Sequence, residues 1–241
     1  MEIDPEILSA ARTAINDELA WAAQDGVDPA QSAEALHSHR LAAALERNGW
    51  HGYLEAYFDQ KSQKRGAGAM GWHRADLYAA NAGTRTRLWV EVKRLWLSPD
   101  GSSAGNARYP TSALLSDWAR DLERLAQGPA EQAGWTTWRL FYLVVRGLES
   151  PVPYRQLERG VGDPSRLPDP DACGAVLSEA IRGLNPEGTG LDLLGRLLTN
   201  ARRHGLAVAP VVQEAVQPGG STGRFWFPLL IGWTDAWRGH R

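Results

Sequence analysis

The sequence is poor in cysteine, with Cys173 as the only one among 241 residues. A single thiol excludes an internal disulfide framework and any zinc site built from cysteine thiolates. The chain also lacks an apolar run of the roughly 20 residues that a membrane-spanning helix needs, and its acidic first residues do not have the pattern of a signal peptide. We therefore expect a cytoplasmic protein with no membrane partner.

An excess of either charge is missing as well, because 26 Lys and Arg residues against 28 Asp and Glu residues give a net charge of −2. This balance argues against a protein that coats nucleic acid non-specifically, but it leaves room for a nuclease with bound metal ions and local basic patches. Internal repeats, a P-loop, and GxSxG, HExxH and Rossmann motifs are all absent. The length fits one large domain, or one domain with an extension.

A stretch of charged and apolar residues in the middle of the chain predicts two strands, Arg74–Ala80 and Arg87–Leu97, joined by a polar Asn-Ala-Gly-Thr turn. Because side chains alternate across a strand, Glu91 and Lys93 share one face, and the valines beside Glu91 point to the other. A strand inside a sheet should not carry such a charge pair without a use for it.

Metal-dependent hydrolysis of phosphodiester bonds is a use that fits these residues. Asp76 on the first strand and Glu91 on the second offer the carboxylate oxygens that Mg²⁺ prefers, and the Val92 carbonyl offers a third oxygen. Mn²⁺ can substitute for Mg²⁺. We expect Lys93 beside the metal, where it would stabilise negative charge or act on the attacking water, with a pKa that burial and the metal can lower.

The spacing of Asp76, fourteen further residues and then Glu91-Val92-Lys93 resembles the PD-(D/E)XK nucleases of the restriction-endonuclease-like superfamily. Ala75 stands where the family name has a proline, and many members of the family lack that proline as well. The resemblance implies an α/β fold with an αβββαβ core and a mixed central sheet. It also implies a DNA endonuclease of the restriction, repair or phage-defence type, with catalytic Asp76, Glu91 and Lys93. A non-catalytic binding or assembly subunit with the same fold is the alternative.

In this family the first core helix often carries a glutamate that completes the metal site. Glu34 lies on the same helix face as Leu41 and Leu45, so we expect it to face the apolar interior within reach of Asp76. Its other interpretation is an ordinary acid in the first turn, placed there by the helix dipole. Glu46 is expected to face solvent and is a rival for the third acid.

The remaining elements place these residues in one domain. Residues 1–27 would form an N-terminal helix packed on the core, residues 28–147 the nuclease-like core, and residues 148–241 an extension of two helices and a β-hairpin that completes the same domain. A helix at 110–127, with Asp121 on its outer face, would connect two parallel strands with a right-handed crossover. Expected helices cover 1–25, 28–48, 110–127, 173–184 and 191–204, and further strands cover 50–58, 136–145, 208–216 and 224–234.

Positive charge gathers in a loop after the strand at 50–58, which carries Glu55 as another rival for the third acid. Lys61, Lys64 and Arg65 lie there among glycines and alanines, a composition that suits phosphate contacts at the edge of a cleft and equally suits a plain solvated loop. Next to the motif, Arg74 and Arg94 are further expected contacts for nucleic acid, and DNA is the expected partner.

Two other groups of residues have structural interpretations. His37 and His39 are expected on the polar face of their helix, since no third nitrogen ligand accompanies them. Trp226, Trp233 and Trp237 make the C-terminal region strongly aromatic. We expect them to pack on the core sheet, with a surface for a homodimer or another protein as the alternative.

Overall fold

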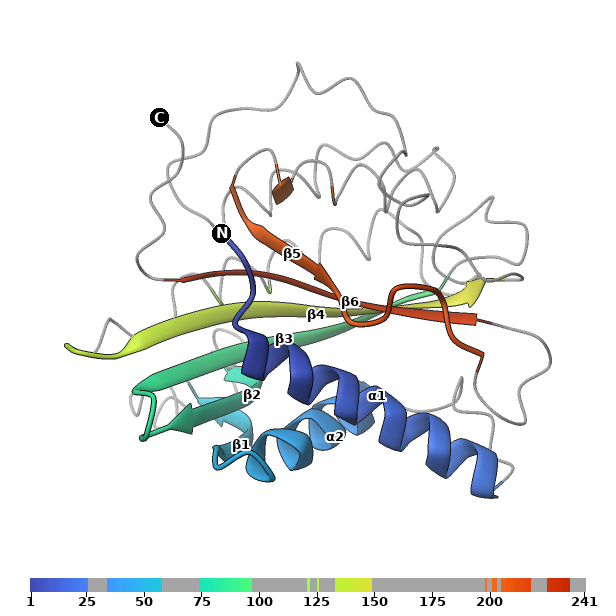
Figure 1. Ribbon diagram of the computed structural model, residues 1–241, viewed down its shortest axis with the longest axis horizontal. Coiled ribbons are helices and arrows are strands. Elements are labelled where there is room, and N and C mark those ends of the chain that lie inside the picture. The colour runs from blue at the N-terminus through green and yellow to red at the C-terminus, as the bar shows by residue number, and fades with distance from the viewer. Residues whose placement is uncertain are drawn as a thin grey trace, which may run out of the picture.

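The computed structural model describes residues 1–25, 34–57, 74–96, 121, 125, 133–148, 198, 201–202, 205–217 and 225–234. These residues form a mixed α/β fold, in which a six-stranded sheet has the strand order β1-β2-β3-β4-β6-β5 (Figure 1). The elements are α1 (Pro5–Asp25), α2 (Glu34–Glu46), β1 (His51–Tyr57), β2 (Arg74–Asn81), β3 (Thr86–Trp96), β4 (Thr136–Leu148), β5 (Ala207–Pro210) and β6 (Phe225–Thr234). No helix in this part of the chain is long and apolar enough to cross a membrane.

The centre of the sheet is the pair β3 and β4, which run parallel along their whole register from Thr86↔Thr136 to Trp96↔Arg146. The expectation of a parallel pair is thereby confirmed. The strands β1, β2 and β3 form an antiparallel meander on one side, and β6 pairs antiparallel with β4 on the other. The C-terminal region therefore extends the core sheet, as expected.

The expected strand at 208–216 was too long. β5 ends at Pro210. Beyond it, the Val211 N–H donates to the Pro228 carbonyl of β6 at 3.0 Å, and Val216 forms an isolated bridge with Trp226. Proline has no backbone N–H, so it suits the end of an edge strand and not its interior. The tryptophans of β6 pack inward as expected, because Trp226 and Trp233 are buried.

Local chemistry satisfies backbone groups at the start of α1 and at the end of α2. The Asp4 carboxylate accepts the Glu6 N–H at 2.9 Å and caps α1. Gly49 has a φ of 79°, and the Trp50 N–H donates to the Leu45 carbonyl at 3.2 Å. This left-handed glycine with its returning hydrogen bond ends α2, somewhat earlier than the sequence predicts.

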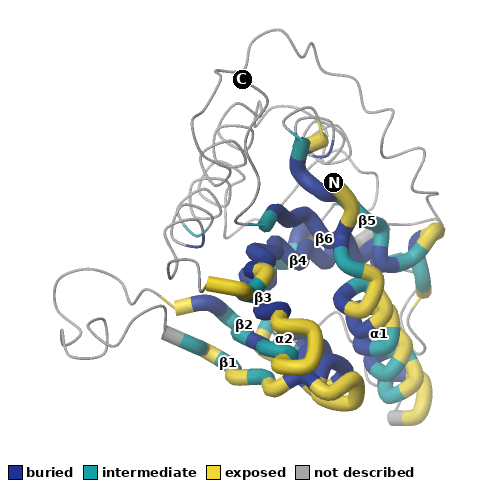
Figure 2. The backbone as a smooth tube through the Cα atoms, turned by 60° about the vertical axis from the view of Figure 1, so that its left-hand side comes forward, coloured by how far each residue is buried: buried dark blue, intermediate teal, exposed yellow. Residues whose placement is uncertain are grey.

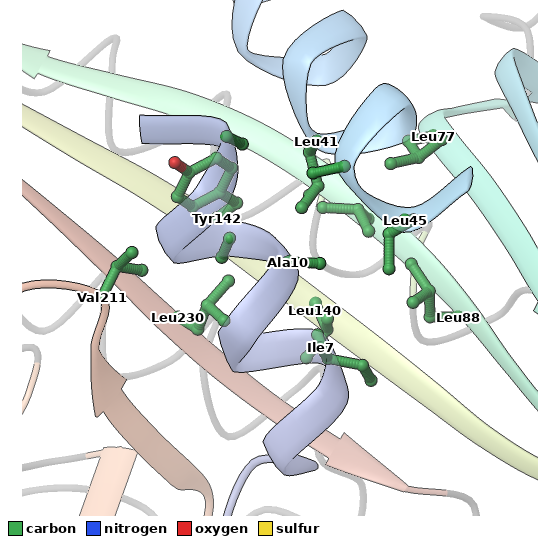
Figure 3. Packing of buried hydrophobic residues seen from close by; sticks show 14 of the residues in the cluster. Ile7, Ala10, Leu41, Leu45, Leu77, Leu88, Leu140, Tyr142, Val211 and Leu230 are labelled. Carbon is green, nitrogen blue, oxygen red and sulfur yellow. The ribbon is translucent and has the colours of Figure 1, made fainter. Parts of the chain in front are cut away.

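Both helices cover the same face of the sheet. Figure 3 shows side chains of α1 directed at β4 and β6, and side chains of α2 directed at β2 and β3. The β3 valines Val90 and Val92 belong to this core and are fully buried. A slip of one residue would put the charged Glu91 and Lys93 into this apolar layer, so the core fixes the register of β3. Glu91 and Lys93 consequently lie on the opposite face.

That opposite face is contacted by two described residues of the segment between β3 and β4. The Arg139 Nε of β4 donates to the Leu125 carbonyl at 3.1 Å, and Asp121 contacts Lys93. The rest of the expected helix at 110–127 lies outside the described residues. So do the start of the helix expected at 28–48, the basic loop after β1, the helix expected at 173–184, most of the helix at 191–204, and Trp237.

Candidate active site

The candidate site lies where the antiparallel pairing of β2 and β3 ends. The last pair of the ladder is Leu77↔Val90, so Asp76 and Glu91 follow as the next positions on the two strands. Here the Asp76 carboxylate accepts the Val92 N–H at 2.7 Å. This bond fixes the Asp76 side chain, and it brings carboxylates of both strands to the sheet face opposite the helices.

Lys93 is held between two carboxylates on this face. Its Nζ donates to Glu91 Oε1 at 2.6 Å and lies 2.7 Å from Asp121 Oδ2, and the three side chains are only 9–13% exposed. Burial alone would lower the pKa of Lys93, but the charges of Glu91, Asp76 and Glu34 outweigh it and raise that pKa. The Lys93 pKa is therefore raised and not lowered as we expected, and the side chain is an ammonium.

The Asp76 carboxylate shows that several acids crowd together. Its pKa is raised, first by burial and further by the charges of Glu34 and Glu55, while Lys93 and the Val92 N–H oppose the rise. Burial and the two neighbouring acids therefore outweigh the stabilising effect of Lys93 on the charged form of Asp76. A carboxylate in such surroundings favours the arrival of a cation.

Glu34 occupies the first turn of α2, as in its alternative interpretation, and not the apolar interior where we expected it. Its Oε1 accepts the Arg94 N–H at 3.3 Å and lies 3.8 Å from the Arg94 Nε, and the side chain is 40% exposed. The first residue of α2 lies beside the C-terminal part of β3, so polar partners and water satisfy its carboxylate. Its charge nevertheless acts on both Asp76 and Lys93.

The two rival acids lie elsewhere. Glu46 is exposed on α2, as expected. Glu55 has a φ of 53° and forms an exposed ion pair with Arg74 at 2.7 Å. The flanking pairs of β1 and β2 put Glu55 across from Asp76, which explains its effect on the pKa of Asp76. Glu55 therefore borders the site from the sheet edge.

Asp121 is the site residue that sequence reasoning missed. We expected it on the outer face of its helix, whereas the structure directs it at Lys93. A signal was present: Asp121 lies four residues before Leu125, which is fully buried, and residues at this spacing share a helix face. An acid on the same face as a core leucine has to meet a cation or lose its charge.

His37 is a second residue that the sequence placed wrongly, because it is buried and not on a polar face. Its Nδ1 lies 2.8 Å from Glu18 Oε2 of α1, and its Nε2 contacts the Arg146 guanidinium of β4. Arginine can only donate, so Nε2 accepts and the proton of a neutral imidazole lies on Nδ1. The Arg146 guanidinium also lies 4.2 Å from the centre of the Trp226 ring. This Glu18–His37–Arg146 chain ties α1 and α2 to β4.

The donor chemistry of the site fits a hard cation. Among the described residues no group of three or more His, Cys, Asp or Glu side chains is arranged to hold a metal ion. Mg²⁺, however, is commonly held by one or two carboxylates, with water completing its shell. Asp76 and Glu91 are such a pair, provided that Glu91 exchanges Lys93 for the metal.

The expected nucleic-acid contacts are brought to the site only in part. Arg94 lies beside Glu34, and Arg74 lies at the β1–β2 edge next to Glu55; the three cations of the basic loop lie outside the described residues. Comparison of the chain with family models, with curated proteins and with solved structures gave no match.

Proposed function

We propose that this protein is a Mg²⁺-dependent nuclease with a restriction-endonuclease-like core that hydrolyses phosphodiester bonds, with DNA as its substrate. The observation that carries the proposal is the convergence of Asp76, Glu91 and Lys93 where the β2–β3 ladder ends. The element order α2-β1-β2-β3, with β4 parallel to β3, supports an αβββαβ core, whose second helix falls mostly outside the described residues. Restriction, repair or phage defence would each use such an activity.

The residues of the site divide the work among them. The Val92 N–H fixes Asp76, which together with Glu91 would hold the metal. Glu34, at the start of α2, is the third acid. When bound, Mg²⁺ supplies a Lewis acid and a more acidic water. Lys93 is charged, so its part is to donate hydrogen bonds to a phosphate oxygen and stabilise negative charge there. Asp121 keeps Lys93 paired when Glu91 turns away from it.

Incubation with plasmid, linear and single-stranded DNA in Mg²⁺, Mn²⁺ or EDTA tests the proposal. We expect cleavage with either metal, none in EDTA, and loss of cleavage in Asp76→Asn, Glu91→Gln and Lys93→Met. Glu46→Gln is the matched control, because it removes an exposed acid of α2 and should cleave normally. Wild-type rates in any two of the three site variants would show the assignment to be wrong.

One observation favours a second function, that of a non-catalytic binding or assembly subunit. Lys93 already has two carboxylate partners, Glu91 and Asp121, and a buried triad of this kind can be purely structural. Metal binding separates the two functions. Titration calorimetry with Mn²⁺ or Ca²⁺ should give binding to the wild type that Asp76→Asn abolishes, whereas a structural triad would bind neither ion.

A further inference from the structure

Three aromatic rings cross the first three strands next to the candidate site. Tyr53 of β1 is the register partner of Tyr78 of β2, which is the partner of Trp89 of β3. The ring centres of Tyr53 and Tyr78 are 6.2 Å apart with planes 28° apart, and those of Tyr78 and Trp89 are 4.4 Å apart at 44°. The rings form a continuous row, which we name the aromatic ladder.

The aromatic ladder lies on the same face of the sheet as the site. Tyr78 is two residues from Asp76 on β2, and Trp89 is two residues from Glu91 on β3, and residues at this spacing point the same way. The ladder therefore lies directly beside the two carboxylates, on the side opposite the helices α1 and α2.

Exposure increases along the ladder away from the sheet centre. Trp89 is 6% exposed and Tyr78 is half-buried, whereas Tyr53 is 62% exposed. Apart from Met1, Tyr53 is the only exposed large hydrophobic side chain in the described part of the chain. Figure 2 shows this edge of the sheet, where β1 has exposed and intermediate residues while β4 and β6 are buried. A ring that the fold leaves in water at this position is available to a ligand.

We propose that Tyr53, supported by the other two rings of the aromatic ladder, stacks an unpaired base of a nucleic acid whose backbone reaches the Asp76–Glu91–Lys93 site, so that the substrate is single-stranded or locally unpaired. This inference rests on the proposed function and specifies its substrate. Every base has a flat face that can stack on tyrosine, whatever its sequence, but in an intact duplex those faces are already covered by neighbouring bases. Because the chain has a net charge of −2, phosphate contacts supply a smaller share of the binding free energy than they do in a basic protein.

Fluorescence anisotropy of short labelled oligonucleotides, single-stranded and duplex, measures the binding in EDTA, where no cleavage occurs. We expect the wild type to bind the single strand more tightly than the duplex, and Tyr53→Ala to weaken the single-strand Kd about 10-fold. Tyr53→Phe keeps the ring and should bind normally. His51→Ala is the position control, because it changes an exposed side chain on the same strand and face.

Two results would overturn the inference. The first is an unchanged single-strand Kd in Tyr53→Ala; if this substitution also dissociates a dimer, the β1 edge belongs to a second copy of the chain. The second is tighter binding of duplex than of single strand by the wild type. Cleavage assays keep the two proposals apart. Binding that depends on Tyr53 without any metal-dependent cleavage would support base stacking on the aromatic ladder and reject the nuclease function. Cleavage of duplex that Tyr53→Ala leaves unchanged would support the nuclease function and reject base stacking on the aromatic ladder.

Discussion

The Asp76 carboxylate destabilises the protein in which it lies. Burial, followed by the charges of Glu34 and Glu55, raises its pKa above the ordinary 3.8. An acid with a raised pKa in the folded state binds more protons there than in the unfolded state, so it costs stability as the pH rises above that ordinary value. The cost is absent in strong acid and grows as the pH rises between the unfolded and the folded pKa values of Asp76.

Asp76→Asn should remove this cost while keeping an oxygen that can accept the Val92 N–H. We expect a higher midpoint of thermal unfolding than that of the wild type at neutral pH in EDTA, and a smaller difference in acid. Metal-dependent cleavage should fall by more than the 10–100-fold typical of losing an outer-shell partner. A lower midpoint at neutral pH would mean that the carboxylate stabilises the fold, contrary to its raised pKa.

His37 is the residue through which stability should respond to mild acid. Burial, and then the charges of Arg146 and Arg94, lower its pKa below 6.5, against the opposing effect of Glu18. Below a pH of about 6.5 His37 binds a proton in the unfolded chain but not in the folded protein. The free energy of unfolding is therefore highest above this pH and decreases as the pH falls. Protonation would also place an imidazolium against the Arg146 guanidinium.

Urea unfolding at several pH values between 7.5 and 5 would measure this loss. The free energy of unfolding of the wild type should fall over this range, and that of His37→Gln should fall less, because glutamine does not titrate. Gln can still donate to Glu18 and accept from Arg146. Parallel pH profiles for the two proteins would show that other groups cause the fall.

At the scale of secondary-structure elements, β6 is wedged between β4, β5 and the N-terminal segment. A Cβ at Gly232 would come within 2.4 Å of Leu140 Cδ2, 2.9 Å of the Arg139 carbonyl oxygen and 3.3 Å of Ile3 Cδ1. We expect Gly232→Ala to lower the free energy of unfolding by about 1–3 kcal/mol through overpacking.

Gly52→Ala on β1 is the control for this effect. The same added methyl group there would meet Ala42 at 3.5 Å and Leu77 at 3.7 Å, which are ordinary contacts. Its unfolding free energy, measured in urea, should stay close to that of the wild type. Equal losses in the two variants would attribute the effect to the strand propensity of the substitution and not to the close approach of β4 and β6.

The elements were more predictable than the contacts between them. Alternation along β3 placed Glu91 and Lys93 on one face, and the segment between β3 and β4 implied parallel strands; both expectations are confirmed. Asp121 and His37 were misplaced, because a polar residue in an amphipathic helix is assigned to solvent unless a partner is known. Their partners come from other elements of the chain, Lys93 of β3 for Asp121 and both Glu18 of α1 and Arg146 of β4 for His37. Periodicity carries no information about such pairs. The chemistry proposed for the site stays a prediction.

At the scale of the whole molecule, a near-neutral chain must obtain its affinity for nucleic acid locally. The expected source is the basic loop, so Lys61→Ala, Lys64→Ala and Arg65→Ala together should weaken binding. Each lost phosphate contact removes about one unit from the slope of log K against log salt. Anisotropy titrations at increasing salt concentration would measure the slope, and an unchanged slope in the triple variant would place the phosphates elsewhere.

The position of β6 beside β4 has a consequence for how the protein is made. The strands β1, β2 and β3 pair with neighbours along the chain and can form as soon as they emerge from the ribosome, whereas Trp138 of β4 pairs with Thr234. Until residues 225–234 have been synthesised, β4 keeps one edge unpaired, and Ile3 of the N-terminal segment lacks the surface around Gly232. Such an edge invites association with other chains. The nascent protein should therefore depend on chaperones until β6 has been synthesised, and its aggregation should increase when ribosomes stall before β6.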